Sequence, residues 1–488
     1  MELELQYTEL SCCEAGESVT LTQEEALEAA IPEYCPEVTR IVDAVGQLCL
    51  REYTGRQISG SVLVTVLYTS EESVGLRSLT QSVPFTCWGE SRPLAACQVL
   101  WAEGRLLLCE AQALTPRRLS LRIMPEWTVC GYRCGTRRLC VGADDDPFLR
   151  LRRQERELCL TVSMAERECS VTGEAAVPPG QPVPEDLLLW RLYPQVGSCQ
   201  LVGNKLLVKG DVTLSALYRC QQQKLHTYTA VLPFSQIVES PSGGEEGEVT
   251  VCPQLLCGEA RLLRGEESSG FAVSAELRLL VRITRRETVA CVTDLYSIRC
   301  AVQPDTEPVS LPPAQERPTR QEAAAHLDFG RQRPFVYVTD VSCAPAAAED
   351  GTPCAAVRMQ LLYLDETEAP AVTERTAQLP LRDGETCTRC GAPEVAFTGT
   401  GCDLRQAVSV TPAAGEPVVL TTVTAVQTVP EREEGRRPSL VMRRLAADET
   451  LWDAAKQYRT DEELIRAVNQ LTEGEVPDKM LLIPRMRP

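Results

Sequence analysis

The sequence predicts a mainly β fold: tandem β-sandwich-like repeats followed by a small β-α-α-β module of the α+β class. Three observations predict it: a strand pattern that recurs along the chain, Pro- and charge-rich stretches between the copies, and helical periodicity near the C-terminus. A chain of 488 residues has room for about three or four domains. The expected domains are a first β repeat (1–145), a second (150–302), a degenerate third (323–430) and the C-terminal module (438–488).

Internal repetition is the main signal. Three blocks recur in the same order with small changes in spacing, and this indicates duplication of one unit. The matched blocks are ISGSVLVTVLY (58–68) with VKGDVTLSALY (208–218), VPF (83–85) with LPF (232–234), and AEGRLL (102–107) with GEARLL (258–263). In the first block Gly60 matches Gly210, and Leu67-Tyr68 matches Leu217-Tyr218.

A third copy is fainter. In CAAVRMQLLY (354–363), Leu362 and Tyr363 match the Leu-Tyr pair, but Ala355 stands in the place of the glycine. Pro380 then aligns with the proline of the second block, and Leu381 replaces its phenylalanine.

Each repeat has the pattern of a β-hairpin. The first block is rich in β-branched residues, and its alternation predicts one buried and one wetter face. A polar loop follows, and the second strand is expected to end at the Val/Leu-Pro-Phe block, because proline cannot donate to the ladder. Residues 22–50, before the first block, are ambiguous and are also compatible with a short helix.

Four stretches are expected to be exposed linkers, because they are rich in proline and charge and poor in apolar residues. They are 144–147, 177–186, 303–322 and 430–438.

Composition narrows the class of protein. The net charge of −19 disfavours binding to nucleic acid, whose phosphates are neutralised by Lys and Arg. No apolar run approaches the roughly 20 residues that span a bilayer, and the acidic N-terminus is unlike a signal peptide, so a cytoplasmic location is expected. The 23 cysteines are then expected to be reduced, many of them as small core hydrophobes, such as Cys109 and Cys159.

The last fifty residues predict strand, two helices and strand. A strand-like run (439–445) precedes a helix whose apolar face holds Leu451, Ala454, Ala455 and Tyr458. Thr460 and Glu463 form a capping box that opens a second helix. The run 480–484 then alternates as a strand that Pro484 ends.

This segment, ETLWDAAKQYRTDEELIRAVNQL followed by VPDKMLLIP, resembles a LysM domain. The resemblance implies binding of N-acetylglucosamine glycans such as peptidoglycan, in a groove between the loop before the first helix and the loop before the last strand. Carried over, the ligand- or partner-binding residues are Asp448, Glu449, Thr450, Leu451, Trp452, Asn469, Gln470, Leu471, Pro477 and Asp478. Asp448 and Asp478 stand where LysM sequences usually have glycine, which puts a neutral sugar groove in doubt. Capping and packing remain the alternative role for Thr450, Leu451 and Asn469.

The repeats also resemble a known domain. Ile-Pro-x-x-Cys-Pro-Glu-Val (31–38), the Gly-containing strand block and Val-Pro-Phe together resemble the SPOCS domain of spore-forming clostridia. Tandem SPOCS repeats with a C-terminal LysM domain resemble the SipL-like family of spore coat assembly proteins. That resemblance implies a role at the forespore surface on the mother-cell side, where the LysM domain docks an ATPase-like coat morphogenetic protein. Peptidoglycan binding by the LysM domain remains the alternative.

Residues for catalysis are not apparent, and neither an enzyme nor a cofactor is expected. The two histidines, His226 and His326, lie in unrelated contexts, and no Gly-rich phosphate loop with Lys-Ser/Thr is present. A zinc site is a weak alternative: Cys387 and Cys390 have ligand spacing, and Cys402, Cys354 or Cys343 would complete it.

Overall fold

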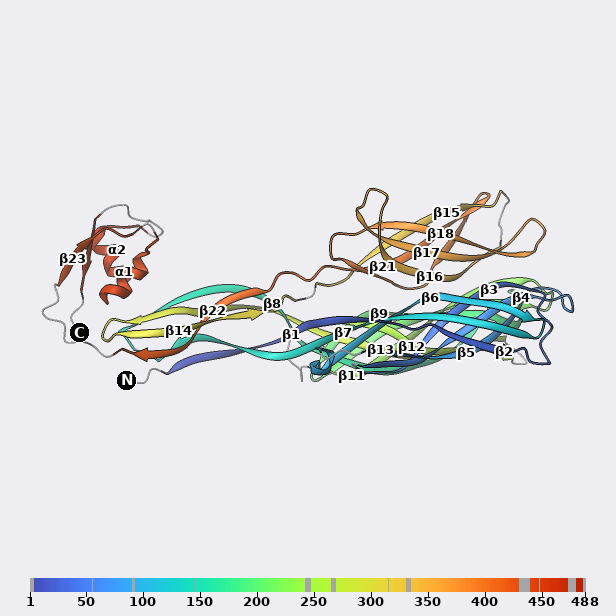
Figure 1. Cartoon of the computed structure of the whole chain (residues 1–488), viewed down its shortest axis with the longest axis horizontal. Coiled ribbons are helices and arrows are strands. Elements are labelled where there is room, and N and C mark those ends of the chain that lie inside the picture. Colours follow the sequence, from blue (N-terminus) through green and yellow to red (C-terminus); the bar gives the residue numbers. More distant parts are fainter. Residues whose placement is uncertain are drawn as a thin grey trace.

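The computed structural model describes residues 4–54, 56–89, 93–144, 146–241, 247–264, 269–314, 316–330, 335–429, 439–446, 448–472 and 480–485. Over these residues the chain forms 24 β-strands, one 3-10 turn (Pro93–Ala96) and two eight-residue α-helices. The predicted mainly β class is confirmed. The strands form three sandwich-like units, which share a stem at one end of the elongated molecule (Figure 1).

The first unit packs two antiparallel sheets. One contains β1 (Leu5–Thr22), β2 (Glu25–Ala30), β6 (Val99–Thr115) and β7 (Arg118–Ala143), with β7 paired to the other three. The other is a meander of β3 (Arg40–Tyr53), β4 (Gln57–Thr69) and β5 (Arg77–Trp88). The helix considered for residues 22–50 does not form, because β2 and β3 occupy most of that stretch and alternate side chains of β2 face inward.

The second unit repeats this arrangement. β8 (Leu149–Ala176), β12 (Glu248–Arg264) and β13 (Ser269–Ser297) form one sheet, in the order β12-β13-β8. The meander consists of β9 (Pro184–Val202), β10 (Lys205–Cys220) and β11 (Leu225–Glu239), in the order β11-β10-β9. The predicted linker at 177–186 therefore lies inside this unit: residues 177–183 connect β8 to β9, and 184–186 are the first residues of β9.

The third unit has the same strand order in shorter pieces. β14 (Val302–Leu311) pairs with β22 (Val418–Thr428), and β15 (Thr319–Asp328), β19 (Thr386–Arg389) and β20 (Glu394–Thr398) pair with β21 (Gly401–Thr411). The meander consists of β16 (Val336–Ala347), β17 (Pro353–Leu364) and β18 (Pro370–Pro380).

Residues 303–322 were expected to be a linker, and this expectation is wrong for β14. Leu311 is fully buried, and β14 pairs with β22 along its whole length. The prolines that suggested a linker, Pro304 and Pro308, are tolerated because β14 has a strand neighbour on one side only. The linker expected at 430–438 lies outside the described residues.

The matched blocks of the first two units occupy equivalent places. Gly60 pairs with Phe85 and Gly210 with Phe234. A Cβ at Gly60 would lie 2.2 Å from the Cys49 carbonyl oxygen and 2.9 Å from the Phe85 ring; one at Gly210 would lie 2.2 Å from the Gln195 oxygen and 2.7 Å from the Phe234 ring. Glycine is therefore required for the same reason in both units.

The two tyrosines of these blocks also have like surroundings. Each side chain is 1% exposed, and each hydroxyl donates to a proline carbonyl oxygen: Tyr68 to Pro36 at 3.3 Å and Tyr218 to Pro182 at 3.0 Å. In both units the first meander strand bulges opposite this tyrosine, at Val42 in β3 and Leu188 in β9.

Two details of the predicted hairpin need correction. Pro84 lies within β5 and Pro233 within β11, so the proline does not end the strand; both strands are sheet edges, where a missing N–H is tolerated. In the third unit Leu379, rather than Leu381, lies opposite Ala355. The expected match of Pro380 and Leu381 to the Pro-Phe pair of the first two units is therefore wrong by two residues.

The outer faces of the three meanders meet. Leu67, Leu217 and Leu362, from corresponding places in β4, β10 and β17, share one buried cluster with Val45, Leu188, Leu189 and Tyr337. The first block of each repeat was expected to expose one face of its strand to solvent. That face is instead covered by the other units, so β4 is buried on both sides. We refer to this cluster as the junction.

The stem is formed by one strand pair from each unit: β1 with β7, β8 with β13, and β14 with β22. These pairs extend beyond the sandwiches and enclose a common apolar core (Figure 1). Its buried residues include Leu10, Leu139, Leu158, Leu160, Val162, Ile283, Val289, Cys291, Leu311 and Leu420.

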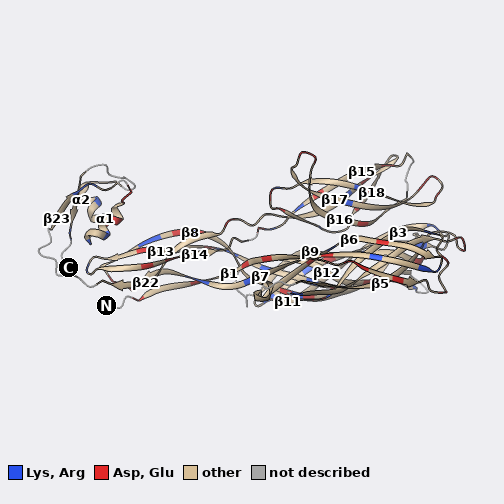
Figure 2. Ribbon diagram, viewed as in Figure 1, with Lys and Arg blue, Asp and Glu red and all other residues tan. Residues whose placement is uncertain are grey.

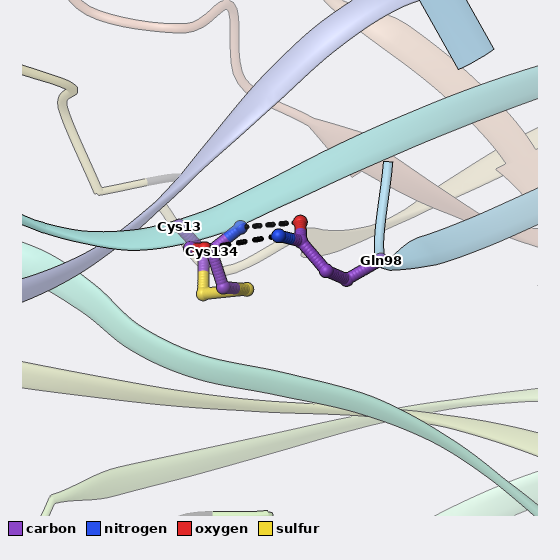
Figure 3. Close-up of a disulfide and its surroundings, with 3 residues drawn as sticks. All are labelled: Cys13, Gln98 and Cys134. Carbon is purple, nitrogen blue, oxygen red and sulfur yellow. Dashed lines mark hydrogen bonds between the residues drawn. A yellow bond between two sulfur atoms is a disulfide. The ribbon is translucent and has the colours of Figure 1, made fainter. Parts of the chain in front are cut away.

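The cysteines depart from the expectation in two ways. Cys13 and Cys134 form a disulfide between the paired strands β1 and β7, where the side-chain amide of Gln98 both accepts from the backbone nitrogen of Cys134 and donates to its carbonyl oxygen (Figure 3). Cys159 is exposed, because it alternates along β8 with the buried Leu158 and Leu160. The other cysteines are free thiols. Cys109, which was expected in the core, is half-buried.

Candidate functional site

The C-terminal module consists of β23 (Leu440–Arg443), α1 (Leu451–Tyr458), α2 (Glu462–Asn469) and β24 (Leu481–Pro484). β23 and β24 pair antiparallel, and the two helices pack on them. Leu451, Ala454, Ala455, Ile465, Leu481 and Ile483 form the buried core. The apolar residues of α1 thus face inward at the spacing that the sequence indicated.

Helix capping fixes both helix starts. Thr450 caps α1 in a capping box with Asp453, and the hydrogen bond from the Thr450 hydroxyl contributes most to holding the pKa of the Asp453 carboxyl below its usual value. Asp461, rather than Thr460, caps α2 and accepts from the Glu463 backbone nitrogen at 3.1 Å. The expected capping box between Thr460 and Glu463 is therefore wrong: the cap lies one residue later, at Asp461, and Glu463 supplies only its backbone N–H.

Several residues of the expected groove carry structural contacts. Asn469 donates to the carbonyl oxygens of Ile465 and Leu482 and accepts from the Leu482 backbone nitrogen at 2.8 Å, which ties α2 to β24. The carboxylate of Glu449 accepts from Arg443 and from the Ala446 backbone nitrogen. Leu451 is 5% exposed, and Leu471 packs half-buried against the same core.

The exposed members of the set are Asp448, Thr450 and Gln470, and Gln470 takes up the left-handed conformation that ends α2. Glu449, on one expected wall of the groove, binds residues before α1, and Asn469, on the other wall, binds α2 and β24. Pro477 and Asp478 lie outside the described residues.

Trp452 faces the body of the protein. Its indole Nε1 donates to Asp294 Oδ2 at 2.7 Å, and its ring meets Tyr296 edge-on with centroids 4.9 Å apart. Lys456, one turn further along α1, pairs with the other oxygen of Asp294 at 2.5 Å. Asp294 and Tyr296 lie near the end of β13, so this side of α1 is packed on the tip of the stem.

Further contacts hold the module at the tip. Arg150 of β8 binds Asp461 through two nitrogens, at 2.8 and 2.6 Å. The Tyr296 hydroxyl donates to the Thr460 carbonyl oxygen at 2.8 Å, and burial raises the pKa of Tyr296. Tyr296 and Ile298 join the core of the module. Sequence reasoning missed this docking site, because its residues are separated by about 160 to 310 positions and carry no shared motif.

The weak zinc candidate is not assembled. Cys387 pairs with Val410 at one end of β21, whereas Cys402 is fully buried near its other end, so about 26 Å of strand separates the two places. Of the residues considered for completing the site, Cys343 does lie near Cys387, at 3.1 Å between the sulfurs. Among the described residues no group of three or more His, Cys, Asp or Glu side chains is placed to hold a metal ion.

Charge gives no sign of a phosphate-binding face in the view of Figure 2, where Lys and Arg are interspersed with Asp and Glu along the strands. Some of them pair with each other, as Arg122 of β7 does with Glu110 of β6 and with Glu24, which lies between β1 and β2. No helix within the described ranges has the length and apolar character that crossing a membrane requires.

These features define a class: an elongated mainly β protein with a small helical module docked at the tip of its stem. Residues 185–255 match the family model described as SipL, SPOCS domain. The match covers the meander of the second unit and the first residues of β12. The chain matches no curated protein and no solved structure.

Proposed function

We propose that this protein is a non-enzymatic adaptor of endospore envelope assembly, in which three SPOCS-type units form a rigid body and a LysM-type module docks a protein partner. The SPOCS match at residues 185–255 supports the link to sporulation. The proposed copies are the three units, with the first strand of the third beginning at β14. The proposed partner is the ATPase-like coat morphogenetic protein, bound at the forespore surface on the mother-cell side.

One observation carries the adaptor role: the module is fixed in a single orientation by the Asp294 and Asp461 contacts. Its α1 side is covered by the stem, so the partner surface has to lie elsewhere on the module. Asp448 and Gln470 are exposed beside the ends of the two helices. A carboxylate at that place suits a polar protein surface better than a neutral sugar ring, and this favours a protein partner over the glycan.

The test compares the two ligands on the full chain. Binding to the purified coat morphogenetic protein is measured by calorimetry, and binding to insoluble peptidoglycan by sedimentation. We expect binding to the protein and a loss of about tenfold or more in the variant Asp448→Lys with Gln470→Lys, since the added positive charges disturb the contact. Asp211→Lys, on the exposed side of β10, is a charge-reversal control outside the module and should bind normally.

Sedimentation with peptidoglycan that N-acetylglucosamine oligomers reverse, together with no binding to the protein partner, would establish the glycan alternative instead. Unchanged binding in the double variant would show that Asp448 and Gln470 are not part of the partner site.

A further inference from the structure

Two cysteines from different units meet at the interface between the first and second units. Cys49 belongs to β3, Cys257 belongs to β12, and their sulfurs are 3.0 Å apart. The two positions are 208 residues apart in the sequence. Cys49 is 3% exposed, whereas Cys257 is half-buried.

The interface around them is close and polar. Gln254, three residues before Cys257 on β12, donates to the Ala102 carbonyl oxygen of the first unit at 2.6 Å. Glu166 of β8 accepts from the Tyr53 hydroxyl and, at 3.1 Å, from the Leu100 backbone nitrogen. These contacts join β3 and β6 of the first unit to β8 and β12 of the second, and the two sulfurs lie within this interface.

The two thiols differ in acidity. The sulfurs of Cys49 and Cys257 share a hydrogen bond, and this hydrogen bond is the main cause that lowers the pKa of Cys257 to about 7. The Gly258 backbone N–H and the charge of Arg51 also lower the pKa of Cys257, while the same pairing and burial raise that of Cys49. Cys257 therefore combines partial exposure with thiolate character, the two properties that make a cysteine reactive.

We propose that Cys49 and Cys257 are a redox-responsive pair, and that a small-molecule disulfide such as glutathione disulfide oxidises them to a covalent cross-link between the first and second units. The Cys257 thiolate attacks one sulfur of glutathione disulfide, which forms a mixed disulfide and releases one glutathione thiolate. Cys49 then loses its proton to solvent, and its sulfur attacks the Cys257 sulfur and displaces the second glutathione. Two protein thiols are oxidised, and one glutathione disulfide is reduced to two glutathione thiols.

The cross-link would act on the assembly of the units. The contacts between the first and second units described above are non-covalent, and a bond between β3 and β12 would prevent these units from separating while it remains. In a reducing medium the same positions stay as thiols and the units depend on packing alone. This inference is independent of the identity of the partner.

The test maps disulfides in the full chain. Protein with reduced thiols is incubated with glutathione disulfide, alkylated and digested, and the peptides are identified by mass spectrometry. We expect a linked peptide pair that contains Cys49 and Cys257 and that dithiothreitol removes. Cys159 is exposed, so a glutathione adduct on Cys159 shows that the oxidant was active under the conditions used.

Single substitutions test the order of attack. Cys49→Ser should accumulate a glutathione adduct on Cys257, because the resolving thiol is missing, whereas Cys257→Ser should give no adduct on the buried Cys49. Cys87→Ser removes another buried thiol of the first unit and should leave the cross-link unchanged. If Cys49 and Cys257 are both alkylated as free thiols when Cys159 already carries glutathione, or if the adduct forms on Cys49 first, the proposal is wrong.

Discussion

Arg191 is a buried charge on which three parts of the chain converge. From β9 its guanidinium donates to the Thr339 carbonyl oxygen at 3.1 Å and to the Gly46 carbonyl oxygen at 2.8 Å, and it pairs with Asp340 at 3.1 Å. Its side chain is only 5% exposed. A guanidinium taken out of water is tolerated because each nitrogen has an acceptor, two of them on the third unit and one on the first. The residue therefore specifies how the units fit together at the junction.

Replacing Arg191 by methionine should destabilise the protein strongly. The change leaves the buried carbonyl oxygens of Thr339 and Gly46 without this donor and the half-buried Asp340 without its partner, and each buried polar group left unsatisfied costs about 1–3 kcal/mol. Denaturant unfolding followed by fluorescence measures the loss. Arg358→Met is the control, since its ion pair with Glu374 is mostly exposed and should contribute less than about 1 kcal/mol. Equal effects of the two substitutions would show that the junction does not depend on Arg191.

Asp43 adds a pH dependence at the same place. Burial raises its pKa to about 6, against the lowering effects of the hydrogen bonds from Thr339 and Ala44; Asp340 raises it further and Arg191 lowers it. The side chain is 7% exposed. The folded state thus holds a proton between about pH 4 and 6 that the unfolded chain releases. The stabilisation that this proton gives is present below the usual aspartate pKa and is lost as the pH rises through about 6.

Asp43→Asn should therefore raise the stability at pH 7 relative to the wild type, by up to about 3 kcal/mol, because a shift of about two pKa units corresponds to that difference. Thermal unfolding from pH 4 to pH 7 measures it in both proteins. The difference in melting temperature should be smallest near pH 4 and grow toward pH 7. A difference that does not change with pH would mean that Asp43 is already ionised in the fold.

At the scale of elements, the glycine that recurs in the first two units, Gly60 and Gly210, is required by close packing against the neighbouring strand. Gly60 and Gly210 each lie under a phenylalanine ring of the neighbouring edge strand, with no room for a Cβ. The stacking of Phe85 on Trp127 fixes the first of these rings further. Equivalent substitutions in the two units should consequently have equivalent effects.

Gly60→Ala and Gly210→Ala should each destabilise their unit by roughly 1–3 kcal/mol or more, since the added methyl group overlaps backbone and ring atoms. Gly197→Ala in β9 is the matched control, because a Cβ there would meet only the Lys209 carbonyl oxygen, at 3.9 Å. Thermal unfolding of the three variants measures the effect. A cost at Gly60 without one at Gly210 would contradict the equivalence of the two units.

The same elements show how far sequence reasoning reaches. Alternation and the repeated blocks predict the strands and the hairpins, because these depend on residues close in sequence. They do not reveal that the second face of β4 is covered, since that face is buried by Leu217 and Leu362 of other units. The prolines of β14 predict a linker from the sequence alone. They are compatible with a strand because β14 pairs with one neighbour only, β22, and this pairing cannot be read from the sequence.

In the candidate site, too, local features can be predicted from the sequence and contacts between distant segments cannot. The helices of the module and their buried faces follow from periodicity, whereas the role of Trp452 does not. Its partners, Asp294 and Tyr296, belong to β13, and no local pattern connects them to α1. The groove residues carried over by resemblance include several that the structure uses for packing and capping, as with Asn469 and Thr450.

At the scale of the molecule, the stem joins the units to the module. Asp294 binds both Trp452 and Lys456, so Asp294→Ala should loosen the module from the tip. Small-angle X-ray scattering should then show a longer and broader distribution of interatomic distances than in the wild type. Asp211→Ala, an exposed carboxylate of the second unit, should leave the distribution unchanged. An unaltered distribution in Asp294→Ala would mean that Arg150 and the apolar core suffice for docking.

Three strand pairs, one from each unit, form a single stem with a common apolar core. Amide hydrogen exchange of the full chain is a direct test of this stem, because slow exchange requires a strand to be buried in a cooperative core. We predict that β14 and β22 exchange as slowly as the portions of β8 and β13 that they pack against. Exchange of β14 and β22 at the rate of an exposed linker, while β8 and β13 remain protected, would show that β14 and β22 are not part of the stem.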